Sequence, residues 1–583
     1  MPQGLSGKIR ENPWPVSRVR SHPALVFAII FVAIFLLHAP LLQLPYFWDE
    51  AGYYVAAARD LLLAGSLIPH TTVSNAHPPL VMAWVALWWK CAGYAPLVTR
   101  SAMLVAAAFS LLGLFRLAEC VANVEVAIAA TLCTALYPVF FAQSSLAQVD
   151  LAAAGLTFWA LCAYVEDRPI ATAAWFSLAA LAKETAILAP AALVGWEVVR
   201  LILPGWFLSR SDKDYVGTAA PGCPVERSST TAAKRIFTLL FPLFPLTFWY
   251  AFHYARTGYV FGNPEFFRYN VAATLSPLRF LLALLARLWQ VFGYMHLWVL
   301  ILGMLLAMLL PPAKDDGVER PRIAIPVQMT FLVVVTAYVM VMALIGGAVL
   351  ARYMLTAVPL VIIVAVSTLR RRLRYWPVAI AVVGCAFIAG WFWNPPYGFS
   401  PEDNLSYRDF IVLHQDGERF LEARYPMAHV LTAWPASDEL RSPWLGYVTR
   451  PVQVVRIEDF SLDEVMSAAD FRKNFDVALV FSTKYDPPHP LLQRWKAWED
   501  LKSRFFGFHR DLPPAAAAQI LGGHIVFSEE RKGQWIAVIE IERSEMQNAA
   551  VLPRALLGSN AAPSALIRAE TIGEESMSLL IVR

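Results

Sequence analysis

The chain carries the stretch ALVFAIIFVAIFLLHAPLLQLP at residues 24–45, followed directly by YFWDE at residues 46–50. A nearly uncharged stretch of this length predicts a helix that crosses a lipid bilayer. Aromatic residues gather where such helices meet water, and the cluster at 46–48 stands at that boundary. Two adjacent carboxylates are costly to hold beside lipid, so Asp49 and Glu50 are predicted to be functional.

The composition places the whole chain among proteins that cross the membrane several times. Of its 583 residues, 58% are hydrophobic and only 16% are charged, and the mean hydropathy is +0.50. That is too apolar for a soluble enzyme. The net charge of +4 is too small to indicate a nucleic-acid partner. The six cysteines show no spacing typical of a disulfide framework or a zinc knuckle.

About eleven apolar segments approach the roughly 20 residues that a spanning helix needs. Arginine and lysine concentrate in every second connection, as in the run at 370–374, which places these connections and the N-terminus in the cytoplasm. An odd number of spans then puts everything after residue 393 outside, and we expect a bacterial inner membrane. The predicted spans are 24–43, 97–115, 124–142, 147–164, 170–183, 185–203, 236–253, 294–311, 323–347, 353–369 and 376–393.

Residues 1–393 are therefore predicted to form a membrane domain, and residues 394–583 a soluble, periplasmic α/β domain. The outer loop 46–96 contains two short apolar helices, which we expect to lie along the membrane surface. No Gly-rich phosphate loop is present, so we expect no nucleotide cofactor. The two loop helices are predicted at 50–64 and 79–92, the outer-domain strands at 429–434, 452–457, 477–481, 524–527 and 535–541, and its helices at 406–424, 462–474 and 488–505.

Acids and cations from distant parts of the chain fall on the outer side of this topology. A carboxylate there can act as a base toward a hydroxyl, and lysine or arginine can stabilise a leaving phosphate. The pattern therefore suits transfer of a group from a lipid-linked phosphate to an alcohol. The candidates are Asp49, Glu50, Tyr53, His77, Asp150, Lys183, Arg256 and Arg352.

In these residues the chain resembles the GT-C superfamily of glycosyltransferases, near its protein O-mannosyltransferase and aminoarabinose-transferase branch. The matching features are Asp49-Glu50 after the first span, His77-Pro78-Pro79-Leu80, Asp150, and Arg352-Tyr353 followed by Pro359. The resemblance implies inverting transfer of a monosaccharide from a polyprenyl-phosphate donor to a hydroxyl of a protein, lipid or glycan. The transfer would take place on the non-cytoplasmic face.

The resemblance also implies a role for individual residues. Asp49 would be the general base, and Glu50 would support the acceptor or the loop. Asp150 would hold the acceptor or orient the donor sugar. Candidates for contact with the donor phosphate or another part of the substrate are Lys183, Arg256, Arg352, His77 and Tyr53. No residue is assigned as a metal ligand, and dependence on a divalent metal stays open.

Simpler interpretations stand beside these roles. Lys183 and Glu184 can form an ordinary interfacial ion pair, and Arg279 and Arg287 are expected to meet lipid headgroups. A multi-span transporter or lipid flippase is the alternative for the whole chain, although such proteins place polar sites near the bilayer midplane and show repeat symmetry. Transfer of a whole oligosaccharide is a third possibility.

Overall fold

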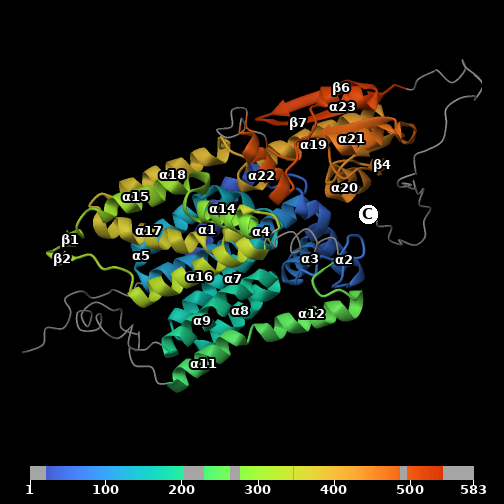
Figure 1. The fold of residues 1–583 in the computed structure, drawn as a ribbon. Helices are drawn as coiled ribbons and strands as arrows, with labels where there is room; N and C mark the ends of the chain where they lie inside the picture. The colour runs from blue at the N-terminus through green and yellow to red at the C-terminus, as the bar shows by residue number, and fades with distance from the viewer. Residues whose placement is uncertain are drawn as a thin grey trace, which may run out of the picture. The chain divides into compact units, whose positions relative to one another are not determined.

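The computed structural model describes residues 22–202, 229–262, 276–345, 347–485, 487 and 495–542, and Figure 1 shows how its helices and strands are arranged. The chain is an α-helical membrane protein with a sheet-containing C-terminal part, as predicted. Six helical stretches are apolar and long enough to cross a membrane, by length and composition. They are Pro23–Leu41, Pro96–Val121, Glu184–Ile202, Ala232–Thr257, Pro277–Met308 and Ile325–Ile345.

Helices also occupy the remaining predicted spans, several of them as shorter apolar helices. A small hairpin of β1 (Lys314–Asp315) and β2 (Val318–Glu319) connects α15 and α16. The helices of this part are α1 (Pro23–His38), α4 (Pro96–Val121), α5 (Val124–Leu136), α6 (Pro138–Gln143), α7 (Val149–Val165), α8 (Pro169–Ala182), α9 (Leu188–Ile202), α11 (Ser229–Leu240), α12 (Leu243–Thr257), α14 (Pro277–Phe292), α15 (Leu297–Met308), α16 (Ile325–Ile345), α17 (Val358–Arg372) and α18 (Trp376–Phe392).

Small residues let the membrane helices approach one another closely, as packing inside a bilayer requires. A β-carbon added at Gly155 of α7 would lie 1.9 Å from the hydroxyl oxygen of Ser110 in α4. Glycine is therefore the residue that fits this crossing, and the crossing fixes the start of α7, where Asp150 lies.

The outer loop folds into the two helices that the sequence predicted. A π-helical turn (Glu50–Tyr54) continues into α2 (Val55–Ala64), and α3 (Leu80–Ala92) follows. Asp60 ties down the segment between them, since its carboxylate accepts hydrogen bonds from the backbone N–H groups of His70 at 2.6 Å and Thr71 at 2.8 Å. The loop is thereby a folded unit.

The C-terminal part contains all five predicted strands in one mixed sheet. Its order is β4-β3-β5-β7-β6, with β3 parallel to β4 and β5, and β7 antiparallel to β5 and β6. Residues 486, 488–494 and 543–583 of the predicted domain lie outside the described residues. The strands are β3 (His429–Thr432), β4 (Gln453–Arg456), β5 (Val477–Phe481), β6 (Gly523–Arg531) and β7 (Gln534–Ile541), and the helices are α19 (Ser406–Arg424), α20 (Ala436–Arg441), α21 (Leu462–Ala469), α22 (Lys496–Phe506) and α23 (Pro514–Leu521).

The outer loop and the C-terminal part share one hydrophobic core. The hydroxyl of Tyr447 donates a hydrogen bond to the carbonyl of Tyr46 at 2.9 Å. A β-carbon at Gly52 would lie 2.8 Å from the indole of Trp434, so the two surfaces meet without space for a side chain. The domain boundary at residue 393 stays a prediction, and it does not coincide with a break in this core.

Candidate active site

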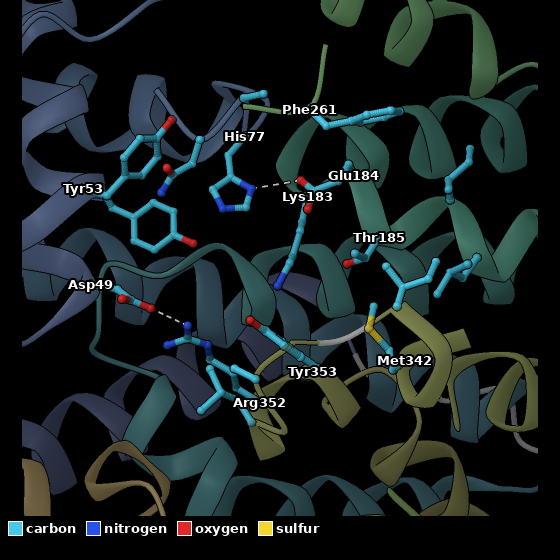
Figure 2. A pocket seen from close by; sticks show the side chains of 18 of the residues that line it. Asp49, Tyr53, His77, Lys183, Glu184, Thr185, Phe261, Met342, Arg352 and Tyr353 are labelled. Atoms are coloured by element: carbon cyan, nitrogen blue, oxygen red, sulfur yellow. Dashed lines mark hydrogen bonds and ion pairs between the residues drawn. The ribbon is translucent and has the colours of Figure 1, made fainter. Parts of the chain in front are cut away.

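A cavity of about 850 Å³ opens beside the outer loop. Figure 2 shows the side chains of Asp49, His77, Lys183 and Arg352 around one space. The walls come from segments far apart in the sequence: the loop after α1, the loop before α3, the α8–α9 junction, α12, α16, the turn before α17, and the start of the C-terminal part. Five of the eight predicted site residues line it, namely Asp49, Tyr53, His77, Lys183 and Arg352.

Arg352 is the centre of the charged side of the cavity. Its side chain is only 4% exposed and forms ion pairs with three carboxylates. Asp49 contacts one terminal nitrogen (Figure 2), Glu402 lies 2.5 Å from the other, and Asp150 lies 3.5 Å from Nε. A planar guanidinium suits such a task because its donors point in several fixed directions. Asp49 and Asp150 thus meet at one site, as the sequence predicted.

Lys183 is the second cation of the cavity. Its ammonium lies 2.5 Å from Asp150 and 4.1 Å from the centre of the Tyr353 ring. Asp150 itself does not line the cavity. It is 6% exposed and lies behind Lys183 and Arg352. Its geometry is that of a residue that orients both cations toward the cavity.

His77 lies on the opposite wall and pairs with Glu184, with Nδ1 3.0 Å from a carboxylate oxygen (Figure 2). The ring lies against Tyr53 and Tyr54, at centroid distances of 5.7 and 5.8 Å. Burial raises the pKa of Tyr53 to about 12, so its hydroxyl stays protonated at neutral pH. The predicted pair between Lys183 and Glu184 is not formed. Instead, Lys183 pairs with Asp150, and Glu184 pairs with His77.

Left-handed backbone directly precedes Asp49 and His77, two of the outer-loop residues that line the cavity. Trp48 has φ of +48° before Asp49, and Ala76 has φ of +58° before His77. Residues with a side chain seldom adopt this conformation, and such strain concentrates at functional sites. The Ala76 turn is held by the indole N–H of Trp249, which donates to the Ala76 carbonyl at 2.9 Å.

Glu50 points away from the cavity, and its geometry does not support a catalytic role. It is fully buried, lies 2.6 Å from Arg100 and accepts backbone hydrogen bonds from Phe47 at 2.9 Å and Ala147 at 2.5 Å. Because consecutive residues at a helical turn project in different directions, only Asp49 of the pair reaches the cavity. Glu50 supports the loop, which was one of its two predicted roles.

Three arginines lie elsewhere than predicted. Arg256 is exposed, does not line the cavity, and lies over the Phe252 ring of its own helix at 5.6 Å. Arg279 and Arg287 were expected at lipid headgroups, but they are 2% and 0% exposed. They donate to the carbonyls of residues 347, 348 and 350, because the chain before the Arg352 turn covers that face of α14.

Sequence reasoning missed Glu402, which follows the last membrane helix. It contacts Arg352 and accepts a hydrogen bond from Gln148 at 3.0 Å. Burial raises its pKa. Burial and the Glu402 carboxylate raise the pKa of neighbouring Asp403 to about 8. An acidic pair in the segment that follows a span was the signal, since Glu402-Asp403 follows α18 as Asp49-Glu50 follows α1.

The other side of the cavity is apolar and comes mostly from membrane helices, with Phe261 added by the loop after α12. Met342 and Phe261 lie on this side in Figure 2. It is lined further by Ile187, Leu188, Leu246, Val341 and Ile345. The cavity therefore combines a charged end with a lipid-like wall.

Comparison with solved structures identifies the architecture. ArnT from Cupriavidus metallidurans bound to undecaprenyl phosphate matches with a TM-score of 0.51 and 12% identity, over 88% of this chain and 97% of that one. The chain has the GT-C fold. The apo state of the same ArnT gives a TM-score of 0.51 at 13% identity, over 88% and 98% of the two chains.

A second structural neighbour is the oligosaccharyltransferase AglB from Archaeoglobus fulgidus. It has a TM-score of 0.47 and 11% identity, over 92% of this chain and 76% of AglB. Comparisons with protein-family profiles and with curated protein sequences gave no match. The predicted resemblance is confirmed at the level of the fold.

Proposed function

We propose that this GT-C protein is a glycosyltransferase that moves a monosaccharide from a polyprenyl phosphate to a hydroxyl acceptor. One observation carries the proposal: a single cavity joins the carboxylate of Asp49, the buried cations Lys183 and Arg352, and an apolar wall of membrane helices (Figure 2). A lipid-linked phosphate needs cations and an apolar surface side by side.

The donor lies with its phosphate toward Lys183 and Arg352 and its polyprenyl chain along the apolar wall. Both cations stay oriented without the substrate, because Asp150 pairs with each of them from behind and Glu402 pairs with Arg352 at the cavity wall. Fixed cations stabilise charge that develops on a leaving phosphate without a reorganisation cost during the reaction. The undecaprenyl phosphate bound to ArnT supports this choice of donor class.

In the reaction, the acceptor oxygen bonds to the anomeric carbon from the face opposite the phosphate. The bond from that carbon to the phosphate oxygen breaks, and the configuration inverts. Asp49 takes the hydroxyl proton, and polyprenyl phosphate leaves with the bonding electron pair. Asp49 suits this task because its side chain is 30% exposed, whereas Asp150 and Glu402 are 4% and 3% exposed.

We place the site on the non-cytoplasmic face of a bacterial inner membrane. Arg320 binds the carbonyls of Arg370 and Leu373, and Arg371 pairs with Glu319, so basic residues gather at the β1–β2 hairpin. Figure 1 draws this hairpin and the outer-loop helices α2 and α3 at opposite ends of the helical part. Basic connections favour the cytoplasm, which leaves the cavity end outside.

The test uses purified protein in detergent with radiolabelled polyprenyl-phosphate sugars. Asp49→Asn should lower kcat by about 10²- to 10⁴-fold, the usual contribution of a general base. Asp459→Asn, at a half-buried carboxylate outside the cavity, should transfer sugar like the wild type. Full transfer by Asp49→Asn would remove Asp49 as the base.

The same assay separates the transferase from the transporter or flippase. A transferase forms product without a membrane between two compartments, and a transporter forms none. Mass spectrometry of glycoconjugates from cells with and without the gene then identifies the sugar and whether the acceptor is protein, lipid or glycan.

A further inference from the structure

Three metal-ligating side chains meet inside the C-terminal part, away from the cavity. His414 and Glu418 lie one turn apart on α19, and Glu439 lies on α20. One ligand atom of each lies within 4.8 Å of the other two. All three side chains are buried, with exposed fractions of 1%, 0% and 0%.

The polar atoms of this cluster are not satisfied by the surrounding protein. Nδ1 of His414 lies 2.6 Å from Glu439 and 3.8 Å from Glu418. With both carboxyl groups ionised, both oxygens of Glu418, and Oε1 of Glu439, lack a hydrogen-bond donor among the described residues. Unpaired polar atoms at full burial are rare and costly, so we expect a bound ion or a proton to satisfy them.

The charge of the cluster is also unbalanced. Within the described ranges, no lysine or arginine forms an ion pair with Glu418 or Glu439, and His414 is their basic neighbour. A single imidazolium balances one of two carboxylates. Either a bound dication or a proton on one carboxyl group would balance the charge of the two carboxylates. These two alternatives predict different results for metal content and stability.

We propose that His414, Glu418 and Glu439 bind a divalent metal ion of the zinc type. Imidazole nitrogens and carboxylate oxygens both bind zinc, with bonds of about 2.0–2.2 Å and neighbouring ligand atoms therefore roughly 3.3 Å apart. The separations of 2.6 and 3.8 Å lie on either side of that spacing, so small rotations of the carboxylates suffice. The i and i+4 positions of His414 and Glu418 place both on one helix face.

The metal would have a structural role next to the outer loop. The Phe410 ring stacks on His414 at 4.0 Å and contacts the rings of Phe47 at 5.3 Å and Trp48 at 5.6 Å. A fixed His414 therefore supports the segment that leads into Asp49. The inference does not depend on the proposed transfer reaction, and its test needs no activity.

The test is metal analysis of the full-length protein in detergent, after removal of any histidine tag and exchange into zinc-free buffer. We expect about one equivalent of metal per chain, lost in Glu418→Gln and retained in Asp416→Asn, an acid on the same helix outside the cluster. Added Zn²⁺ should raise the Tm of metal-stripped wild type and leave that of Glu418→Gln unchanged. Metal retained by Glu418→Gln would overturn the proposal.

The proton alternative predicts the opposite stability change. Glutamine mimics a protonated carboxyl group, so Glu418→Gln would then match or exceed the wild-type Tm, with no stoichiometric metal in either protein. If the variant does not purify, X-ray absorption on zinc-loaded wild type decides. One nitrogen with oxygen ligands supports the site, whereas a purely oxygen shell or one with several nitrogens refutes it.

Discussion

A substitution in the buried Glu50–Arg100 ion pair tests whether Glu50 has a structural role or a catalytic one. Both side chains are buried, at 0% and 1% exposure, and their charged atoms lie 2.6 Å apart. Arg100 also donates to the carbonyls of Pro45 at 2.7 Å and Ser145 at 2.9 Å. The pair thus joins the segment before Asp49 to the loop before α7.

Glu50→Gln keeps the shape of the side chain but removes its charge. Three donors face Glu50: Arg100 and the backbone N–H groups of Phe47 and Ala147. An amide turns its own NH₂ group toward at least one of them and leaves Arg100 without its counter-charge. Breaking one side of a buried pair costs about 3–5 kcal/mol. At roughly 2 °C per kcal/mol, the Tm should fall by about 6–10 °C.

The assay is thermal unfolding followed by tryptophan fluorescence in one detergent, with sugar transfer measured well below the Tm. Glu50→Gln combined with Arg100→Met should lose less stability than the two single changes together, because neither charge is left alone. Asp49→Asn is the matched control and should lose activity with little change in Tm. A Glu50→Gln protein with wild-type Tm and no transfer would refute the bracing role and restore Glu50 as catalytic.

Three further predictions follow from single contacts. Arg352→Lys should lower kcat about 10²-fold in the same assay with little loss of protein, because an ammonium cannot reach three carboxylates as the guanidinium does; unchanged kcat would contradict the assigned role. Burial and Glu402 raise the pKa of Asp403 to about 8, so the folded protein binds this proton more tightly than the unfolded chain does. The free energy of unfolding therefore falls as the pH rises toward and through that value. Scans of Tm from pH 6 to 9 should show this fall, and Asp403→Asn should flatten it. Gly155→Ala should destabilise the protein by about 1–3 kcal/mol, since the added methyl would lie 1.9 Å from Ser110 Oγ, and an unchanged Tm would contradict that packing.

Local pattern was enough to predict much of this protein. Apolar runs predicted the membrane helices, and short β-like runs predicted all five strands of the C-terminal sheet. Position after a span marked Asp49, and position before one marked Arg352. These predictions succeed because burial in lipid or in a sheet leaves a continuous run of apolar or β-branched residues along the chain itself.

The sequence did not predict which charged residues pair with each other, because only the tertiary structure selects these partners. Asp49 and Arg352 are 303 residues apart, and nothing local distinguishes this pairing from one between Asp49 and Arg256. Adjacent residues diverge: Asp49 enters the cavity while Glu50 turns to Arg100. A buried charge needs a counter-charge, but the sequence contains several residues that could supply it. The packing of distant helices decides which of them comes within reach.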